Sequence, residues 1–252
     1  MVQRRAVTKE DKALQPDSLP TLYKTLIPLT PDRHQGYFLS QDRNYDFVSM
    51  ANAIPVTVDE FPQVMRHYPI VLAGGATPTP VALVGYKPGV NDHVDKDGKW
   101  SDGTYIPAYL RRYPFAYIRE SQEAERHILC ADLSSTLFST SGTDARALFD
   151  AEGKPAKVLN DVMDFCTRYD QSVQRTQAVI KEAVKLGLID PSEVTISRKG
   201  QNLKVEGFNI ISEQKLRELP DETLAGLTRR GVLPLFTAHH LSMTNFAGFG
   251  QV

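Results

Sequence analysis

The chain has 252 residues, of which 41% are hydrophobic and 23% charged, and its formal net charge is −1. This length suits one large domain or two small ones and is sufficient to bury a full core. The near-zero charge supplies no field that would attract nucleic acid or an anionic membrane, so neither is expected as a partner. No apolar run reaches the length of a membrane span, so we expect no membrane insertion.

Residues 1–22 are polar and aperiodic, which predicts a flexible segment ahead of a single domain over 23–252. The basic residues near the start are not followed by an apolar h-region, so no Sec signal peptide is expected. The expected location is therefore the cytoplasm. A place at the cell surface would require export that does not depend on such a signal.

Two stretches of the chain, 61–70 and 106–115, repeat one pattern. Both begin with an apolar residue and a proline, and both continue with Arg-x-Tyr-Pro and a large hydrophobe. Because the residue before a proline avoids the α region, each copy predicts one or two helical turns, a break and then a strand. We interpret the pattern as an internal tandem duplication, and we expect the two copies to pack as one pseudo-symmetric sheet.

The duplication extends through a later turn of the form Asp-x-acid-Gly-Lys, at 95–99 in the first copy and 150–154 in the second. Glycine in such a turn takes a positive φ at little cost. The copies therefore cover 61–100 and 106–155. Ahead of them, short apolar pieces between residues 23 and 54 predict short strands rather than long helices.

The second half of the chain has a different pattern. Apolar residues recur at three- and four-residue steps over 156–186 and predict a long amphipathic helix. A β-hairpin is predicted over 194–211, and shorter helices follow over 213–219, 221–230 and 232–249. The expected class is α+β, with mostly antiparallel strands in the duplicated N-terminal half and the long and short helices in the C-terminal half.

The residues that could bind a metal or act as nucleophiles lack supporting partners. Cys130 and Cys166 have neither disulfide nor zinc spacing, and are expected to be small buried hydrophobes. His-x-Asp at 93–95 matches part of a facial iron triad, for which His127 is the only nearby candidate as second histidine. The duplicate carries Leu148 where His93 stands, which favours a surface histidine beside a turn. The two Asp-x-acid-Gly turns lack the ligand positions of a calcium loop. We expect no metal and no cofactor.

The repeated Arg and Tyr residues leave two alternatives open. Each Arg could cap the C-terminal carbonyls of its short helix while the Tyr packs on the proline. Alternatively, the pairs could form a surface suited to a carboxylate, a phosphate or a sugar ring. His239 and Ser242 would share a helix face and could hydrogen-bond, but no acid is spaced to orient the histidine, so no catalytic residue is assigned. The candidate ligand-binding residues are Arg66, Tyr68, Trp100, Arg111, Arg112, Tyr113 and His239.

Several motifs, taken together, resemble the SapC family of bacterial proteins over about residues 45–246. They are Tyr68-Pro69-Ile70-Val71, Pro80 to Gly85, Asp95-x-Asp97-Gly98-x-Trp100, Tyr105 to Phe115, Leu148-Phe149-Asp150-x-Glu152-Gly153, Gln177, Glu213-x-Lys215-Leu216-x-x-Leu219-Pro220-Asp221, and Ala238-His239 with Ser242 and Asn245. The resemblance implies an association with a paracrystalline surface layer, where members are described as part of a coat that confers serum resistance. It implies no catalytic residues.

Our first expectation is a non-enzymatic protein of the bacterial envelope or surface layer that contacts protein or surface polysaccharide. The alternative is a cytosolic accessory protein, or an unrecognised enzyme, with a ligand pocket near the repeated Arg and Tyr-Pro motifs. A role without catalysis is favoured, and self-association is left open.

Overall fold

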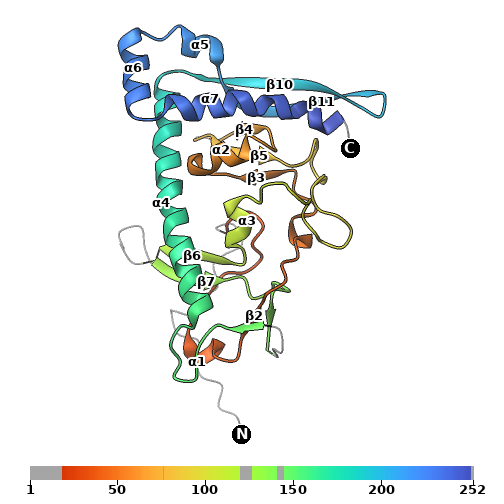
Figure 1. The fold of residues 1–252 in the computed structure, drawn as a ribbon, viewed down its shortest axis with the longest axis vertical. Coiled ribbons are helices and arrows are strands. Elements are labelled where there is room, and N and C mark those ends of the chain that lie inside the picture. The colour runs from red at the N-terminus through yellow and green to blue at the C-terminus, as the bar shows by residue number, and fades with distance from the viewer. Residues whose placement is uncertain (1–18, 76, 120–126, 141–144, 251–252) are drawn as a thin grey trace. The chain divides into compact units, whose positions relative to one another are not determined.

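The computed structural model describes residues 19–75, 77–119, 127–140 and 145–250 (Figure 1). The chain divides into two compact units, the first made of residues 1–44 and 112–170 and the second of residues 45–111 and 171–252. Helices and antiparallel sheets occur together, so the predicted α+β class is confirmed. The predicted segment 1–22 lies mostly outside the described residues, and one domain over 23–252 stays a prediction.

The first unit contains two small antiparallel sheets, with strand orders β1-β7-β6 and β8-β2-β9. A short helix, α1 (Pro31–His34), lies between β1 and β2 in the chain. The strands are β1 (Ile27–Pro28), β2 (Phe38–Ser40), β6 (Phe115–Arg119), β7 (His127–Ala131), β8 (Phe138–Ser139) and β9 (Ala145–Ala147).

The second unit contains a five-stranded antiparallel sheet with the order β10-β11-β4-β5-β3. Its strands are β3 (Ala53–Pro55), β4 (Ile70–Ala73), β5 (Thr79–Leu83), β10 (Ile189–Arg198) and β11 (Gln201–Ile211). Its α-helices are α2 (Phe61–Val64), most of α3 (Ala108–Arg112), α5 (Glu213–Arg217), α6 (Asp221–Arg229) and α7 (Leu233–Ser242), and its 3-10 helices are η3 (Asp46–Val48), η4 (Val58–Glu60) and η5 (Met243–Gly250).

The long helix α4 (Lys157–Lys185) confirms the helix predicted over 156–186. Gly187, with φ of 69°, lies just after its end, where a left-handed residue stops a helix. Residues 157–170 of α4 belong to the first unit and residues 171–185 to the second. The helix is amphipathic, and no helix among the described residues is long and apolar enough to cross a membrane.

Each unit contains three neighbouring strands with the same order and register: β3, β5 and β4 within the five-stranded sheet of the second unit, and β1, β7 and β6 in the first. An Ile-Pro strand pairs with the second strand of a hairpin, whose first strand follows a Tyr-Pro pair. The aligned residues on the first hairpin strand, the second hairpin strand and the Ile-Pro strand are Ile70, Ala82 and Ile54 in the second unit and Phe115, Ala131 and Ile27 in the first. The similarity therefore extends to a third strand that the sequence pattern did not reveal.

The turns at 95–99 and 150–154 have the same geometry. The Asp95 carboxylate accepts two backbone N–H groups, from Asp97 at 2.9 Å and from Lys99 at 2.8 Å. The Asp150 carboxylate accepts from the matching residues of its own turn, at 3.0 and 2.8 Å. Glycines with φ of 73° and 76° occupy the fourth position of the two turns. The predicted turn chemistry therefore holds in both copies.

The prediction that both copies pack as one pseudo-symmetric sheet is wrong. The hairpin β4–β5 and the hairpin β6–β7 belong to different sheets. The physical reason is that each hairpin pairs with an Ile-Pro strand from earlier in the chain, β3 or β1, so each copy completes a sheet of its own. Common origin of the copies stays a prediction, and residues 120–126, between β6 and β7 in the chain, lie outside the described residues.

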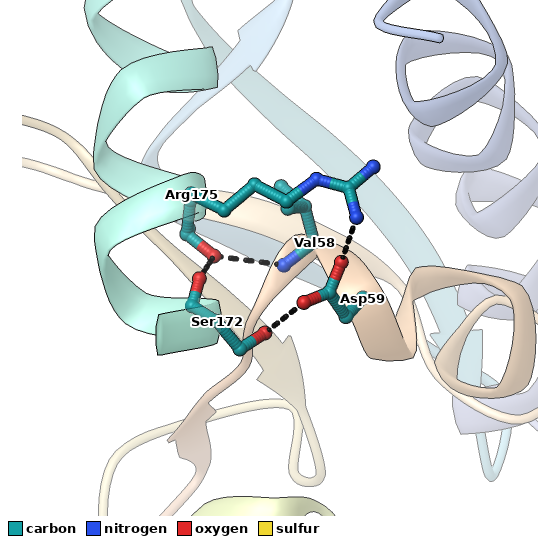
Figure 2. Close-up of polar contacts among 5 residues, drawn as sticks. Val58, Asp59, Ser172 and Arg175 are labelled. Carbon is teal, nitrogen blue, oxygen red and sulfur yellow. Dashed lines mark hydrogen bonds and ion pairs between the residues drawn. The ribbon is translucent and has the colours of Figure 1, made fainter. Parts of the chain in front are cut away.

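The second half of α4 forms hydrogen bonds with residues 58–59 of η4, the short helix that precedes α2 (Figure 2). The Asp59 carboxylate accepts from the Ser172 hydroxyl and from the Arg175 guanidinium, both at 2.6 Å. The Val58 N–H donates to the Thr176 hydroxyl at 2.9 Å. This last hydrogen bond is buried. It gives a partner to an N–H in the first turn of η4, which has no acceptor within the helix, so α4 stabilises the start of this short helix.

Replacing Asp95 or Asp150 with Ala removes a carboxylate that accepts two backbone N–H groups. We expect each change to lower the free energy of unfolding by about 1–2 kcal/mol, measured by urea denaturation. Asp102→Ala, at an exposed position near the first turn, is the control and should change it by less than about 0.5 kcal/mol. A loss in only one of the two turn variants would contradict their equivalence.

Candidate functional site

Two of the predicted site residues, Tyr68 and Trp100, lie together in the second unit. The Trp100 indole N–H donates to the Tyr68 hydroxyl at 3.1 Å, and that hydroxyl donates to the Tyr105 carbonyl oxygen at 2.6 Å. Burial raises the pKa of Tyr68 to about 12. Tyr68 is therefore a neutral donor at physiological pH, and it ties the start of β4 to the segment that precedes α3.

His93 is part of this aromatic cluster. Its ring stacks on Trp100, with centroids 5.8 Å apart and an interplanar angle of 20°, and meets the Tyr68 ring edge-on at 4.8 Å. The residue is half-buried, and burial lowers the pKa of its imidazole. His93 therefore flanks the turn at 95–99, as predicted, but its ring is partly buried against Tyr68 and Trp100 rather than lying free on the surface. Among the described residues, no group of three His, Cys, Asp or Glu side chains could hold a metal.

Glu60 is a buried acid that the sequence analysis did not select. One carboxylate oxygen accepts from the Thr57 N–H at 3.3 Å, which makes a capping box at the start of η4. The other accepts from the Ala108 N–H at 3.0 Å and lies 3.4 Å from the Tyr105 hydroxyl. Burial raises the pKa of Glu60 to about 7, although these donors and the nearby Arg111 act in the opposite direction. Glu60 thus connects η4 to α3 through backbone groups.

The Arg111 side chain contacts residues that precede its helix. Its side chain turns back, where Nε donates to the Ile106 carbonyl at 3.1 Å and a terminal nitrogen donates to the Tyr105 hydroxyl at 2.9 Å. The guanidinium lies over the Tyr105 ring, 5.4 Å from its centroid. These contacts involve Tyr105 and Ile106, which precede α3, so they give no support to the capping alternative, which stays a prediction for Arg111.

Arg66 is exposed just after the end of α2. The carbonyl of Met65, at the C-cap of that helix, accepts a hydrogen bond from the Asn245 amide at 2.8 Å. A residue 180 positions along the chain therefore caps α2. Arg66 and Arg111 share exposure, whereas Tyr68 and Trp100 are buried, so the four do not form one open surface.

Helix α7 attaches to the sheet through polar side chains that bind backbone groups. His239 Nε2 accepts from the Ile211 N–H at 3.1 Å, and His240 Nε2 lies 2.7 Å from the Ile211 carbonyl oxygen. The Ser242 hydroxyl accepts from the Ile70 N–H at 2.9 Å and donates to the His239 carbonyl at 2.5 Å. The side-chain pair of His239 and Ser242 considered from the sequence is therefore not formed.

Burial, together with the neighbouring His240, lowers the pKa of His239 to about 4. The imidazole is neutral at physiological pH, with Nε2 as its acceptor nitrogen. His239 is only 1% exposed, so no ligand reaches the ring without displacing the helix. We conclude that His239 has a structural role in docking α7.

Arg112 and Tyr113 belong to the first unit and are buried there. The Arg112 guanidinium lies 4.5 Å from the centroid of the Tyr169 ring and 5.6 Å from that of Tyr23. Tyr113 meets the Tyr23 ring edge-on at 5.2 Å. This is a cation–π core. Of the two repeated Arg and Tyr pairs, Arg66, Tyr68 and Arg111 therefore belong to the second unit and Tyr113 belongs to the first. A site shared by both copies stays a prediction.

Both cysteines are buried and unpaired by disulfides, as the sequence predicted. Burial raises the pKa of the Cys130 thiol to about 11 and that of Cys166 to about 12. Neither thiol forms an appreciable fraction of nucleophilic thiolate at neutral pH.

A model described as SapC matches residues 29–249 of the chain, which is most of its length. The chain therefore belongs to the SapC family, and the family identified from its motifs is confirmed. No curated protein and no solved structure matches this chain.

The first pH prediction concerns His239. Its pKa is about 4 in the folded protein and near 6.5 when unfolded, so its stabilising contribution is complete above pH 6.5 and is lost as the pH falls toward 4. Urea denaturation at pH 7 and pH 4 measures this loss as a difference between the unaltered protein and the variant His239→Gln, because the opposite contribution of Glu60 is the same in both and cancels. We expect the difference to reach about 3 kcal/mol. His239→Gln keeps an acceptor for Ile211 and should show a smaller loss. His127→Gln, on an exposed histidine, should behave as the unaltered protein does, and equal loss in all three proteins would refute the assignment.

The second pH prediction concerns Glu60 and has the opposite sign. Its pKa is about 7 when folded and near 4.5 when unfolded, so its contribution to stability is lost as the pH rises from 4.5 through 7. Glu60→Gln removes the titration. We therefore expect the free energy of unfolding of the variant to gain about 3 kcal/mol relative to the unaltered protein between pH 4 and pH 8. Glu152→Gln, at an exposed position, is the control, and a gain there of equal size would reject the explanation.

Proposed function

We propose that this member of the SapC family is a non-enzymatic protein of the bacterial envelope or surface layer, acting through contacts with a protein or a surface polysaccharide. The observation that carries the proposal is that the side chains with potential for catalysis are engaged in hydrogen bonds with the backbone. Glu60, His239 and Ser242 each bind backbone N–H groups of neighbouring elements. Side chains placed in this way hold the fold together.

Acid–base and nucleophilic catalysis require a group that can reach a substrate atom. The acceptor nitrogen of His239 already binds the Ile211 N–H, and the Ser242 hydroxyl binds a donor and an acceptor of the backbone. Freeing either group would break the attachment of α7 to the sheet. This arrangement favours a role in binding.

The exposed cationic side chains suit the contacts proposed. Arg66 and Arg111 are exposed in the second unit, and Arg111 is held over the Tyr105 ring. Guanidinium groups bind carboxylates and phosphates, which acidic protein surfaces and many surface polysaccharides carry. The family's link to a surface layer supplies the cellular context of the proposal.

Protease treatment of intact host cells tests the location. If the protein is at the surface, an externally added protease should digest it while a cytosolic marker stays intact. Recovery of full-length protein with the marker, from the soluble fraction of lysed cells, would reject the envelope location. Lysed cells treated in the same way form the control, because the protein must be digested there.

A further inference from the structure

The matching registers of β3, β5 and β4 and of β1, β7 and β6 identify one strand edge that another strand occupies in the second unit but that no strand of the described residues occupies in the first. In the second unit, β4 pairs on its outer side with β11, through Leu72 with Asn209 and Ala73 with Phe208. In the first unit, β6 holds the position of β4, and Tyr117 and Ile118 are the residues that match Leu72 and Ala73. No strand among the described residues pairs with the outer side of β6.

The direction of the backbone groups on β6 follows from its neighbours. In an antiparallel ladder, successive residues bond alternately to the strand on one side and to the strand on the other. The Leu129 carbonyl accepts from Leu29, next to β1, so Leu129 and its partner Tyr117 point away from each other. The Tyr117 N–H and carbonyl therefore point outward from the sheet.

The outward-facing backbone groups two residues earlier on each strand already have partners. The Ile70 N–H of β4 donates to Ser242, and the Phe115 carbonyl of β6 accepts from the Tyr23 hydroxyl at 2.7 Å. Leu72 then pairs with β11. Tyr117 of β6 matches Leu72, and its backbone is the position that has no strand partner among the described residues.

We propose that the outer edge of β6 at Tyr117 binds an extended, antiparallel strand of a partner protein, as the edge of β4 binds β11. This inference rests on the proposed contact function and assigns it a partner class, a polypeptide rather than a polysaccharide. Backbone hydrogen bonds supply the affinity in strand addition of this kind.

The sequence of β11, which pairs with the equivalent edge of β4, indicates what sequence the partner strand should have. Residues 207–211 of β11 read Gly-Phe-Asn-Ile-Ile, an uncharged run with apolar side chains. Its Asn209 lies opposite the residue that matches Tyr117, and its Phe208 lies opposite the residue that matches Ile118. We therefore expect a partner segment with an aromatic or branched residue opposite Ile118 and no charge in that stretch.

The probe is a synthetic peptide with the sequence of residues 204–212, added to the purified full-length protein. Hydrogen exchange followed by NMR reports each amide separately. We expect saturating peptide to slow exchange of the Tyr117 amide by about tenfold or more. The Ala116 and Ile118 amides already face β7 and should change much less. An unchanged Tyr117 amide, or protection confined to the second unit, would overturn the proposal.

Two N-methylated peptides provide the matched control and leave the protein unaltered. Methylation at the position of Asn209 removes the N–H that would face β6, and should weaken binding about tenfold or more. Methylation at the position of Phe208 removes an N–H that faces the other way, as it faces β10 in the native sheet, and should have less than about a twofold effect. Equal weakening by both peptides would exclude strand addition at this edge.

The outcome separates this inference from the proposed function. Peptide binding by a protein that protease treatment finds in the cytosol would reject the envelope location and keep the strand site. A surface-exposed protein that does not bind the peptide would keep the location and reject the strand site.

Discussion

Each hairpin in this protein leaves half of its backbone groups pointing away from its own ladder, and these groups must find partners. In the second unit the partners come from distant segments of the chain. Ile70 of β4 donates to Ser242 of α7, and Leu72 pairs with β11. The positions of α7 and of the β10–β11 hairpin follow from this requirement. Strands as short as β4 cannot make a stable sheet alone.

This constraint also explains why the C-terminal family motif contains polar residues. His239, Ser242 and Asn245 lie on α7 and η5 and bind backbone groups of β11, β4 and α2, respectively. In a sequence, a histidine followed three residues later by a serine suggests a catalytic pair on one face of a helix. In the structure the same residues supply hydrogen-bond partners to backbone groups of three elements. Such partners are needed because a buried N–H or carbonyl without one raises the free energy of the folded state. Glu60 likewise connects η4 to α3, because its carboxylate accepts a hydrogen bond from the Ala108 N–H.

Much of the local structure could be predicted from the sequence. The spacing of apolar residues located α4 to within a residue at each end, and the prolines after Tyr68 and Tyr113 located the start of β4 and β6. Thr57-x-x-Glu60 is also a recognisable capping box in the sequence, and this pattern is the local signal that points to Glu60. The apolar pieces between residues 23 and 54 also predicted short strands, and β1, β2 and β3 confirm them. The role of β1 and β3 as matching partners of the two hairpins could not be predicted, because two or three residues are too few to show a period.

The sequence by itself determined the class, the long helix, the repeated hairpins and turns, and the family, because each depends on spacing over a few residues or on a family pattern. Only the tertiary structure decided what the candidate site residues do. Tyr68 and Arg112 are buried in different units, Arg111 turns back to Tyr105, and His239 binds β11. The physical reason is that the partner of each side chain is selected by burial and hydrogen bonding with segments far away in the chain. No local pattern carries that information.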